Sequence, residues 1–472
     1  MSTMTATDNF AFVSVRELGR MLRAGETTPT ALAEYFLDRL DTVGRRYNAV
    51  ATVTRVRALA EAREAERELA GGYDRGPLHG IPYGAKDLLA TGGGIPTSWG
   101  AAPLREQQFA HDATVIARLK AAGAVLVAKL AMVELAGGFG YNQPNAAFTG
   151  PGITPWNADA WSGGSSSGSG SAVGAGAVPF AIGSETWGSI LTPSSYCGIS
   201  GLRPTYGRVS RHGAMALSYT LDKLGPMCRT ADDCGLVLAA IAGPDPDDDT
   251  SLPAVYRYAP QTVRTGGFRL GVLADAVDGT QPEVSANFAA TLDALREIAT
   301  VETVTLPDHP YNAVANTLLG AEAASAMDDF VTSGKAAQLT APEDRIGGYA
   351  MRTVSGKDYV TALRLRRHMV RDLDALFAQY DAILAPTTNA VASPLTVRFS
   401  DYFRSPTGRR PAIGAAGNVA GLPAIGVPNG FGERGLPTSV QFVGRAGAEN
   451  MVIAVAHAYQ QRTDWHTRRP PV

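Results

Sequence analysis

Apolar residues recur with helical spacing in the first part of the chain. Over residues 14–42 they stand three and four positions apart, which predicts helices that begin after Ser14 and again at Pro29. The Ala/Glu/Arg-rich stretch 56–70 has helical composition and ends at Gly71-Gly72. Residues 1–70 are therefore expected to form a helical lead-in.

Beyond Leu78 the pattern changes, because short apolar runs alternate with glycine-marked turns and helical stretches. The expected strands are 124–127, 268–273 and 381–384, and the expected helices are 114–122, 282–298 and 447–461. Residues 310–375 are expected to be mostly helical. Alternation over this length predicts an α/β fold around a mixed sheet.

The composition is that of a globular protein with a real core, with 45% hydrophobic and 18% charged residues. A net charge of −2 and the lack of a dense Lys/Arg stripe argue against nucleic acid or an anionic membrane as partner. The three cysteines (Cys197, Cys228 and Cys234) do not form a disulfide framework and are expected to be reduced and structural. With no signal peptide or long apolar run in this sequence, a cytoplasmic location is expected.

Gly, Ser and Ala dominate residues 162–176, and this composition has several interpretations. It is compatible with a flexible linker, but apolar blocks on both sides favour a segment whose small residues allow close approach of backbone amides to a ligand. Gly164–Gly168 satisfies the G-x-S-x-G pattern of a nucleophile elbow, and the same stretch approximates a dinucleotide-binding loop. Both motifs require a preceding buried strand, which residues 157–161 do not supply.

Lys86 lies in an apolar block, residues 76–87. It is either an ordinary surface lysine or a desolvated one, whose lowered pKa would let it act as a base. None of the seven histidines belongs to a metal-spaced pair, so no ligand set for a metal is visible. His79, in the same block, is interpreted as a structural turn residue, with lining of a site as the alternative.

Together these blocks resemble the amidase-signature family. Ile81-Pro82 with Lys86-Asp87 fits the family's lysine motif, Gly163–Ser166 fits its first serine motif, and Ser189 stands where its nucleophile stands. The resemblance extends to residues 221–226 and 418–445, and so covers most of the chain outside 240–375.

The resemblance implies a single α/β domain, 1–472, with a mixed sheet covered by helices. It divides the chain into the lead-in 1–70, a catalytic core 71–240, a variable helical insertion 240–375 and a C-terminal part of the core, 376–472.

The resemblance also implies a serine amidohydrolase without metal or cofactor. Ser189 would be the nucleophile, Ser165 the relay after a cis Gly164–Ser165 bond, and neutral Lys86 the base. The backbone N–H groups of Thr186, Trp187, Gly188 and Ser189 would form the oxyanion hole. The expected reaction is hydrolysis of an amide, with an aryl ester or carbamate as further options, through an acyl-enzyme.

Two positions depart from the family's usual T-D-T-G-G-S-I-R turn. Trp187 replaces a glycine and Leu191 replaces an arginine. These changes weaken an assignment to the amidotransferase component that makes glutaminyl-tRNA together with a partner subunit, which stays an alternative. A scaffold that lost activity is another, although Lys86, Ser165 and Ser189 are all present.

By position in the family, the substrate pocket is expected to include Ala136, Gly137, Gly138 and Phe139. The two glycines would leave space there. Trp187 would be either an aromatic wall of the pocket or a packing residue under the turn. With no cation placed to hold a carboxylate, the expected substrate is a neutral apolar or aromatic small molecule, an amide or carbamate, and a homodimer is a compatible assembly.

Overall fold

One mixed sheet runs through the molecule. The computed structural model describes residues 10–259, 267–403 and 412–472, and within them it forms an eleven-stranded sheet. The strands are β1 (Val50–Val53), β2 (Pro82–Lys86), β3 (Val125–Leu130), β4 (Phe180–Glu185), β5 (Ser200–Arg203), β6 (Lys223–Cys228), β7 (Phe268–Leu273), β8 (Ala299–Val304), β9 (Ala382–Pro386), β10 (Ala424–Phe431) and β11 (Pro437–Val443).

The order of the strands is β1-β3-β2-β4-β6-β5-β10-β11-β9-β7-β8. β2 runs parallel to β3 and β4, and β7 runs parallel to β8 and β9, whereas the strands between β4 and β9 pair antiparallel. The predicted α/β class with a mixed sheet is therefore confirmed, as is the strand expected at 268–273.

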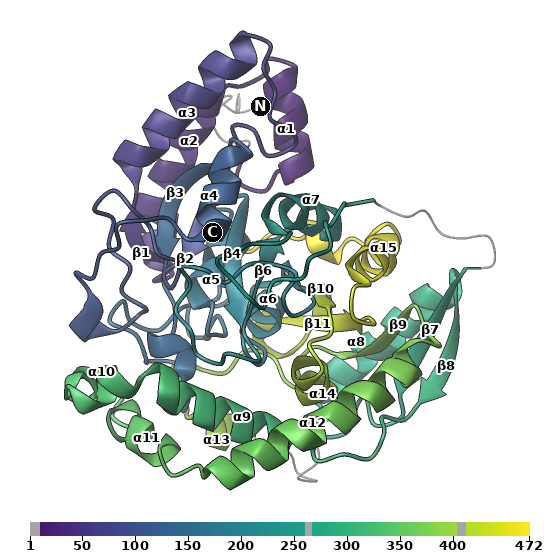
Figure 1. Cartoon of the computed structure of the whole chain (residues 1–472). Helices are drawn as coiled ribbons and strands as arrows, with labels where there is room; N and C mark the ends of the chain where they lie inside the picture. Colours follow the sequence, from purple (N-terminus) through teal and green to yellow (C-terminus); the bar gives the residue numbers. More distant parts are fainter. Residues whose placement is uncertain (1–9, 260–266, 404–411) are drawn as a thin grey trace.

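Helices surround this sheet (Figure 1). They are α1 (Val15–Arg23), α2 (Pro29–Arg39), α3 (Arg55–Ala70), α4 (Thr114–Ala121), α5 (Ser167–Gly174), α6 (Leu191–Cys197), α7 (Ala231–Ile241), α8 (Pro282–Arg296), α9 (Tyr311–Ala326), α10 (Asp328–Thr332), α11 (Asp344–Met351), α12 (Gly356–Phe377), α13 (Phe399–Tyr402), α14 (Ile413–Val419) and α15 (Glu449–Gln460).

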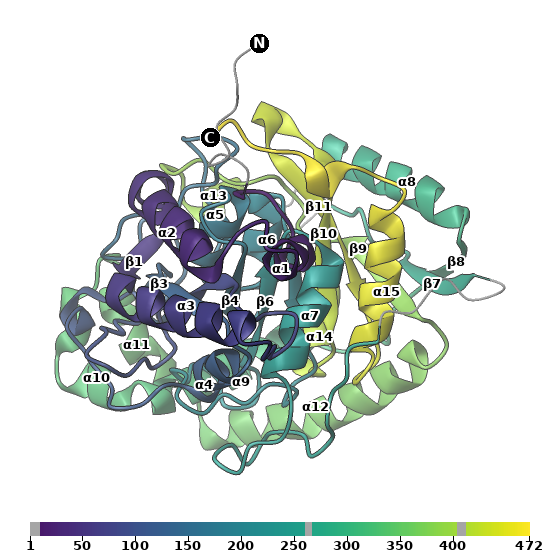
Figure 2. The same ribbon diagram turned by 90° about the horizontal axis from the view of Figure 1, so that it is seen from above.

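Capping side chains begin the first two helices at the residues that the sequence predicts. The Ser14 side chain accepts a hydrogen bond from the backbone of Glu17, and Thr28 caps α2 in the same way with Pro29 at the first helical position. In Figure 1, α1, α2 and α3 lie together at one end of the molecule, while α9 to α12 form a band at the opposite end. Figure 2 views the molecule from the end at which α1, α2 and α3 lie.

The Gly/Ser segment is not a flexible linker, because residues 167–174 form the helix α5 and residues 162–166 before it are buried as well. All eight residues of α5 are buried between the sheet and α6. A Cβ at Gly168 would lie 2.4 Å from the Ala49 carbonyl and 2.5 Å from the Ala131 amide. The small residues thus allow close approach of the protein's own backbone, where a ligand was expected.

Residues 240–375 are not only helical, which corrects the expected insertion. They also supply β7 and β8, which extend the sheet beyond β9. The apolar pattern of the sequence does not predict β8. Thr300 and Thr303 are polar and exposed at the sheet edge, where a strand needs few apolar residues.

The three cysteines are free and buried, as expected. No helix in the described ranges is long and apolar enough to cross a bilayer.

Candidate active site

Lys86 is the last residue of β2, and its side chain is fully buried. Its Nζ donates hydrogen bonds to the hydroxyl oxygens of Ser165, at 2.7 Å, and Ser184, at 2.8 Å. Burial lowers the pKa of Lys86 to about 7, against the opposing attraction of Asp222 and Glu185. A lysine with this pKa is neutral in a large fraction of molecules near pH 7, and its neutral form can accept a proton from a hydroxyl.

Ser165 precedes α5 and is itself completely buried. The Gly164–Ser165 peptide bond is cis, as the family resemblance implies. The backbone of the next residue, Ser166, donates to the carbonyl of Ser189 at 3.3 Å. The two predicted serine segments are therefore adjacent, with the lysine on the Ser165 side.

Ser189 lies in the tight turn between β4 and α6 and is 8% exposed. Gly188 before it adopts a φ of 89°, a left-handed conformation that glycine takes without strain. In the described part of the chain, the N–H groups of Trp187, Gly188 and Ser189 donate to no other residue. Donors without a protein acceptor are what an oxyanion hole needs, so the predicted assignment of these groups stays open to test.

A buried ion pair fixes the base of this turn. One oxygen of Glu185 accepts from the backbone N–H groups of Ile190 and Leu191, and the other accepts from Arg203 at 2.9 Å and from Asn418 at 3.2 Å. Burial alone would raise the pKa of Glu185, but Arg203 and Lys223 hold it at about 2. The carboxylate therefore stays ionised beneath the turn.

Asp222, just before β6, and Lys223, its first residue, hold Thr186 by its side chain and its main chain. Asp222 accepts the Thr186 hydroxyl at 2.5 Å and also the backbone N–H groups of Leu217 and Ser218. Lys223 donates to the Thr186 carbonyl at 3.4 Å and to Asn418 at 2.7 Å. The turn is thus anchored from β6 and from α14.

A cavity of about 550 Å³ opens beside the turn, at Trp187, Gly188 and Leu191. Six aromatic side chains line it, namely Tyr141, Trp161, Trp187, Tyr196, Phe399 and Phe403. Among the described residues of its lining, only Glu185 and Arg203 are charged, and they are paired with each other. Trp187 is therefore a wall of a cavity, one of the two alternatives for this residue. We call this space the aromatic cavity.

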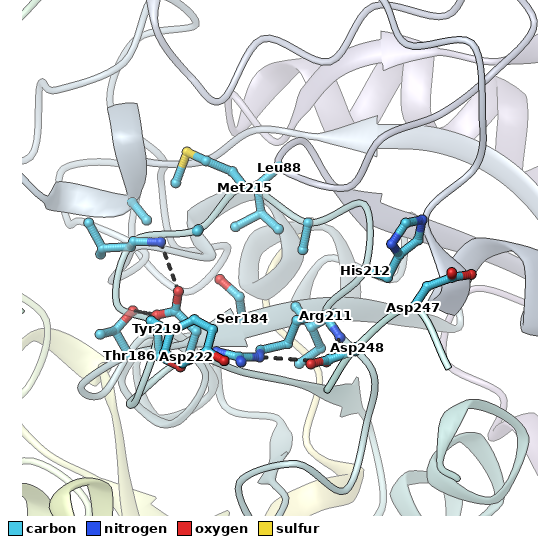
Figure 3. A pocket seen from close by; sticks show the side chains of 15 residues that line it. Leu88, Ser184, Thr186, Arg211, His212, Met215, Tyr219, Asp222, Asp247 and Asp248 are labelled. Atoms are coloured by element: carbon cyan, nitrogen blue, oxygen red, sulfur yellow. Dashed lines mark hydrogen bonds and ion pairs between the residues drawn. The ribbon is translucent and has the colours of Figure 1, made fainter. Parts of the chain in front are cut away.

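A second cavity, of about 200 Å³, lies against Ser184 and Thr186 (Figure 3). We call it the small cavity. Of the predicted pocket residues, Ala136 lines this one and Trp187 lines the aromatic cavity.

Gly137, Gly138 and Phe139 line neither cavity, contrary to expectation. The space expected at the two glycines is filled, because a Cβ at Gly137 would meet the Tyr141 ring and one at Gly138 would meet Leu217. Phe139 is buried against Phe330.

Sequence reasoning missed Ser184, the second partner of Lys86. Its position five residues before Ser189 carries no signal by itself, because a serine at a strand end is usually structural. Asp222 and Lys223 were recognised only as part of a family motif, and their contacts with Thr186 depend on the antiparallel pairing of β4 with β6.

His79 is structural, as the preferred interpretation has it. It is buried, its Nε2 lies 3.0 Å from Glu68, and its Nδ1 accepts from the backbone of Arg75. The described residues contain no group of three or more His, Cys, Asp or Glu side chains that could hold a metal ion.

Comparisons with known proteins identify the family of this chain. The family model described as Amidase matches residues 31–453. A glutamyl-tRNA(Gln) amidotransferase subunit from Roseiflexus castenholzii is 38% identical over 496 residues, which cover 98% of each chain.

Among solved structures, the peptide amidase from Stenotrophomonas maltophilia superposes with a TM-score of 0.86 at 32% identity, covering 98% of this chain and 99% of that one. The corresponding glutamyl-tRNA(Gln) amidotransferase subunit from Thermotoga maritima gives a TM-score of 0.79 at 27% identity, covering 96% and 95%. Because the family model and these relatives extend over nearly the whole chain, this protein belongs to the amidase-signature family and is an amidohydrolase of that family.

Proposed function

We propose that this enzyme hydrolyses a small carboxamide through an acyl-enzyme on Ser189. The observation that carries the proposal is the buried Lys86, whose Nζ lies 2.7 Å from the Ser165 hydroxyl. Neutral Lys86 takes a proton through Ser165 from Ser189, and the Ser189 oxygen attacks the amide carbon. The N–H groups of residues 186–189 stabilise the oxyanion that forms.

Substitution of the three side chains tests this mechanism. Ser189→Ala is expected to abolish turnover, and Lys86→Ala should cost nearly as much because the relay loses its final acceptor. Ser165→Ala should lower kcat by roughly 10³- to 10⁴-fold with the fold intact. Amide turnover and labelling by a fluorophosphonate are the measurements, with circular dichroism to verify folding. Near-normal turnover in folded Ser189→Ala would exclude the mechanism, and lack of labelling in the wild type would support an inactive scaffold.

For the acyl part of the substrate, the aromatic cavity favours an apolar or aromatic group. Its aromatic walls suit apolar contact, and Arg203, the one cation in the described part of the lining, is paired with Glu185, so none of these described residues is available to hold a free carboxylate. An aryl carbamate or ester with the same acyl group is a second substrate type that this site would accept.

The names of the sequence relatives favour another candidate, a glutamine amidase that works as one component of an amidotransferase. The relative from Roseiflexus castenholzii carries an amidotransferase name at 38% identity. In that case free glutamine would be the substrate and a partner protein would be required.

The two candidates differ in measurable specificity. A comparison of kcat/KM for an aryl amide with that for glutamine, in wild type and Trp187→Gly, decides between them. If Trp187 is a wall of the acyl site, the aryl amide is preferred and Trp187→Gly lowers that preference about 10-fold or more. A preference for glutamine, or an aryl preference untouched by Trp187→Gly, would favour the amidotransferase component.

A further inference from the structure

Glu322 is a buried carboxyl group in a part of the chain where the sequence carries no catalytic motif. It lies on α9, within residues 240–375, and its side chain points into the protein and not toward solvent. A buried carboxyl group needs hydrogen-bond donors around it. The residues that supply these donors show which part of the molecule Glu322 holds in place.

Two of the donors come from the segment just before β6. The Oε2 of Glu322 accepts the hydroxyl of Ser218, and it also accepts the backbone N–H of Thr220 at 3.0 Å. Its Oε1 accepts the hydroxyl of Tyr359, on α12, at 2.9 Å. Ser218 is completely buried. The carboxyl group therefore joins two helices to the segment 217–222.

Ser218 in turn holds Asp222. Its backbone N–H donates to the Asp222 carboxylate at 2.8 Å, and its carbonyl accepts the Asp222 N–H at 3.0 Å. The other oxygen of Asp222 accepts the Thr186 hydroxyl at 2.5 Å, a bond that is dashed in Figure 3. A continuous series of contacts therefore runs from Glu322 through Ser218 and Asp222 to Thr186, in the turn that carries Ser189.

The neighbouring helix α12 holds the same segment and a second support of the turn. Arg366 donates to the carbonyl of Thr220 at 3.0 Å and to the carbonyl of Val419 at 2.7 Å. Val419 follows Asn418, the α14 residue that donates to Glu185 at 3.2 Å. The helices α9, α12 and α14 pack against one another, and Figure 1 shows α14 beside α12. The supports of the turn on both sides therefore lean on the α9–α12 pair.

We propose that Glu322 is a positioning residue for the reaction, which acts through Ser218 and Asp222 on the turn at Thr186. This inference rests on the proposed function, because it presumes that the N–H groups of residues 186–189 bind an oxyanion. A small shift of the turn would weaken hydrogen bonds that form fully only in the transition state. Binding of the intact amide depends less on these bonds, so a loss should appear in kcat and not in KM.

Substitutions of Glu322 test the inference on phenylacetamide or glutamine, whichever the wild type hydrolyses faster. Glu322→Ala should lower kcat about 10-fold and change KM by less than about twofold, because the Ser218 hydroxyl loses its acceptor. Glu322→Gln keeps an oxygen that can accept from Ser218 and Thr220, so it should restore most of the turnover. Tyr359→Phe is the matched control. It removes the donor to the other oxygen of the same carboxyl group, and kcat should stay close to that of the wild type, because water can replace the hydroxyl of this half-buried residue.

A double variant separates positioning from general destabilisation. In the Thr186→Val background the series of contacts is already broken at its far end. Addition of Glu322→Ala should then lower kcat by no more than about twofold. A further loss as large as that in the wild-type background, an equal loss in Tyr359→Phe, or an unchanged kcat in folded Glu322→Ala would each overturn the inference.

If Glu322→Ala does not fold, Ser218→Ala provides a second test. It deletes the hydroxyl that Glu322 accepts and leaves the backbone bonds with Asp222 in place. Its kcat should fall to a similar extent, and unchanged turnover in this variant would overturn the inference. Failure of the proposed function is distinguishable, because Ser189→Ala would then keep its turnover whatever the Glu322 variants do.

Discussion

At the scale of single residues, Lys86 places a charge-bearing side chain in a fully buried position. Its amine lies between two serine hydroxyls, at 2.7 and 2.8 Å, and burial favours the neutral form. A lysine of ordinary pKa would be almost fully protonated at neutral pH and a poor base. Burial of this one side chain therefore supplies the base of the proposed reaction without a histidine.

The pH dependence of turnover follows from the direction of this shift. In the proposed mechanism only the neutral form of Lys86 is active, and its population rises through a pKa of about 7. We expect kcat/KM to rise about tenfold per pH unit below pH 7 and to level above it. A pH–rate profile on an uncharged amide measures this, with Lys335→Ala, an exposed lysine, as the control that keeps the profile. A maximum below pH 5 would contradict the assignment of Lys86 as base.

At the scale of elements, the β4–α6 turn is held by residues from β5, β6 and α14. Glu185 pairs with Arg203 and also accepts the N–H groups of Ile190 and Leu191, so a single carboxylate joins the turn to the sheet. Lys223 at the start of β6 and Asp222 just before it fix Thr186 from the side of the neighbouring strand. Contacts with the surrounding elements therefore hold the turn on both sides of Ser189.

Loss of the Glu185 charge is expected to destabilise the protein. Glu185→Gln leaves the buried Arg203 guanidinium without its counter-charge, which costs about 3–5 kcal/mol when one partner of a buried pair is removed. Thermal unfolding should show a clear fall in Tm. The surface pair Arg269–Glu302 provides the matched control, since Glu302→Gln should hardly change Tm. Equal shifts in the two variants would be inconsistent with a structural role for the buried pair.

Asp222 is expected to act on the rate through Thr186. Asp222→Asn weakens the hold on the Thr186 hydroxyl and should lower kcat by about 10- to 100-fold with little change in KM, because the N–H groups of the turn lose alignment. Thr186→Val removes the same hydrogen bond by deleting its donor hydroxyl. Steady-state kinetics of both single variants and the double variant measure the coupling. Additive losses in the double variant would show that the two side chains act independently.

At the scale of the whole molecule, segments far apart in sequence meet at the site. Lys86 comes from β2, Ser165 from the segment before α5, Ser189 from the β4–α6 turn and Asn418 from α14. The aromatic cavity adds Phe399 and Phe403 from the C-terminal third. We propose that residues 71–240 and 376–472 together form the catalytic core, with β7 and β8 of the intervening segment extending its sheet.

Several features are set by the sequence alone. The caps of α1 and α2 depend on side chains within three residues of the helix start, and local hydrogen bonds need no distant partner. The spacing of apolar residues predicts β7 and α8, because it can be read within each segment by itself. The motifs around Lys86, Ser165 and Ser189 identify the family, because their residue types and order are visible in the chain itself.

Only the tertiary structure decides how these parts act together. The helical state of α5, the second hydroxyl on Lys86 and the support of Thr186 by Asp222 all depend on contacts between segments 18 to 98 residues apart. The same is true of the pocket, where Tyr141 and Leu217 fill the space expected at Gly137 and Gly138. Packing and burial are properties of assembled strands and helices. Residue type and spacing therefore do not predict which side chains become buried or where a cavity remains.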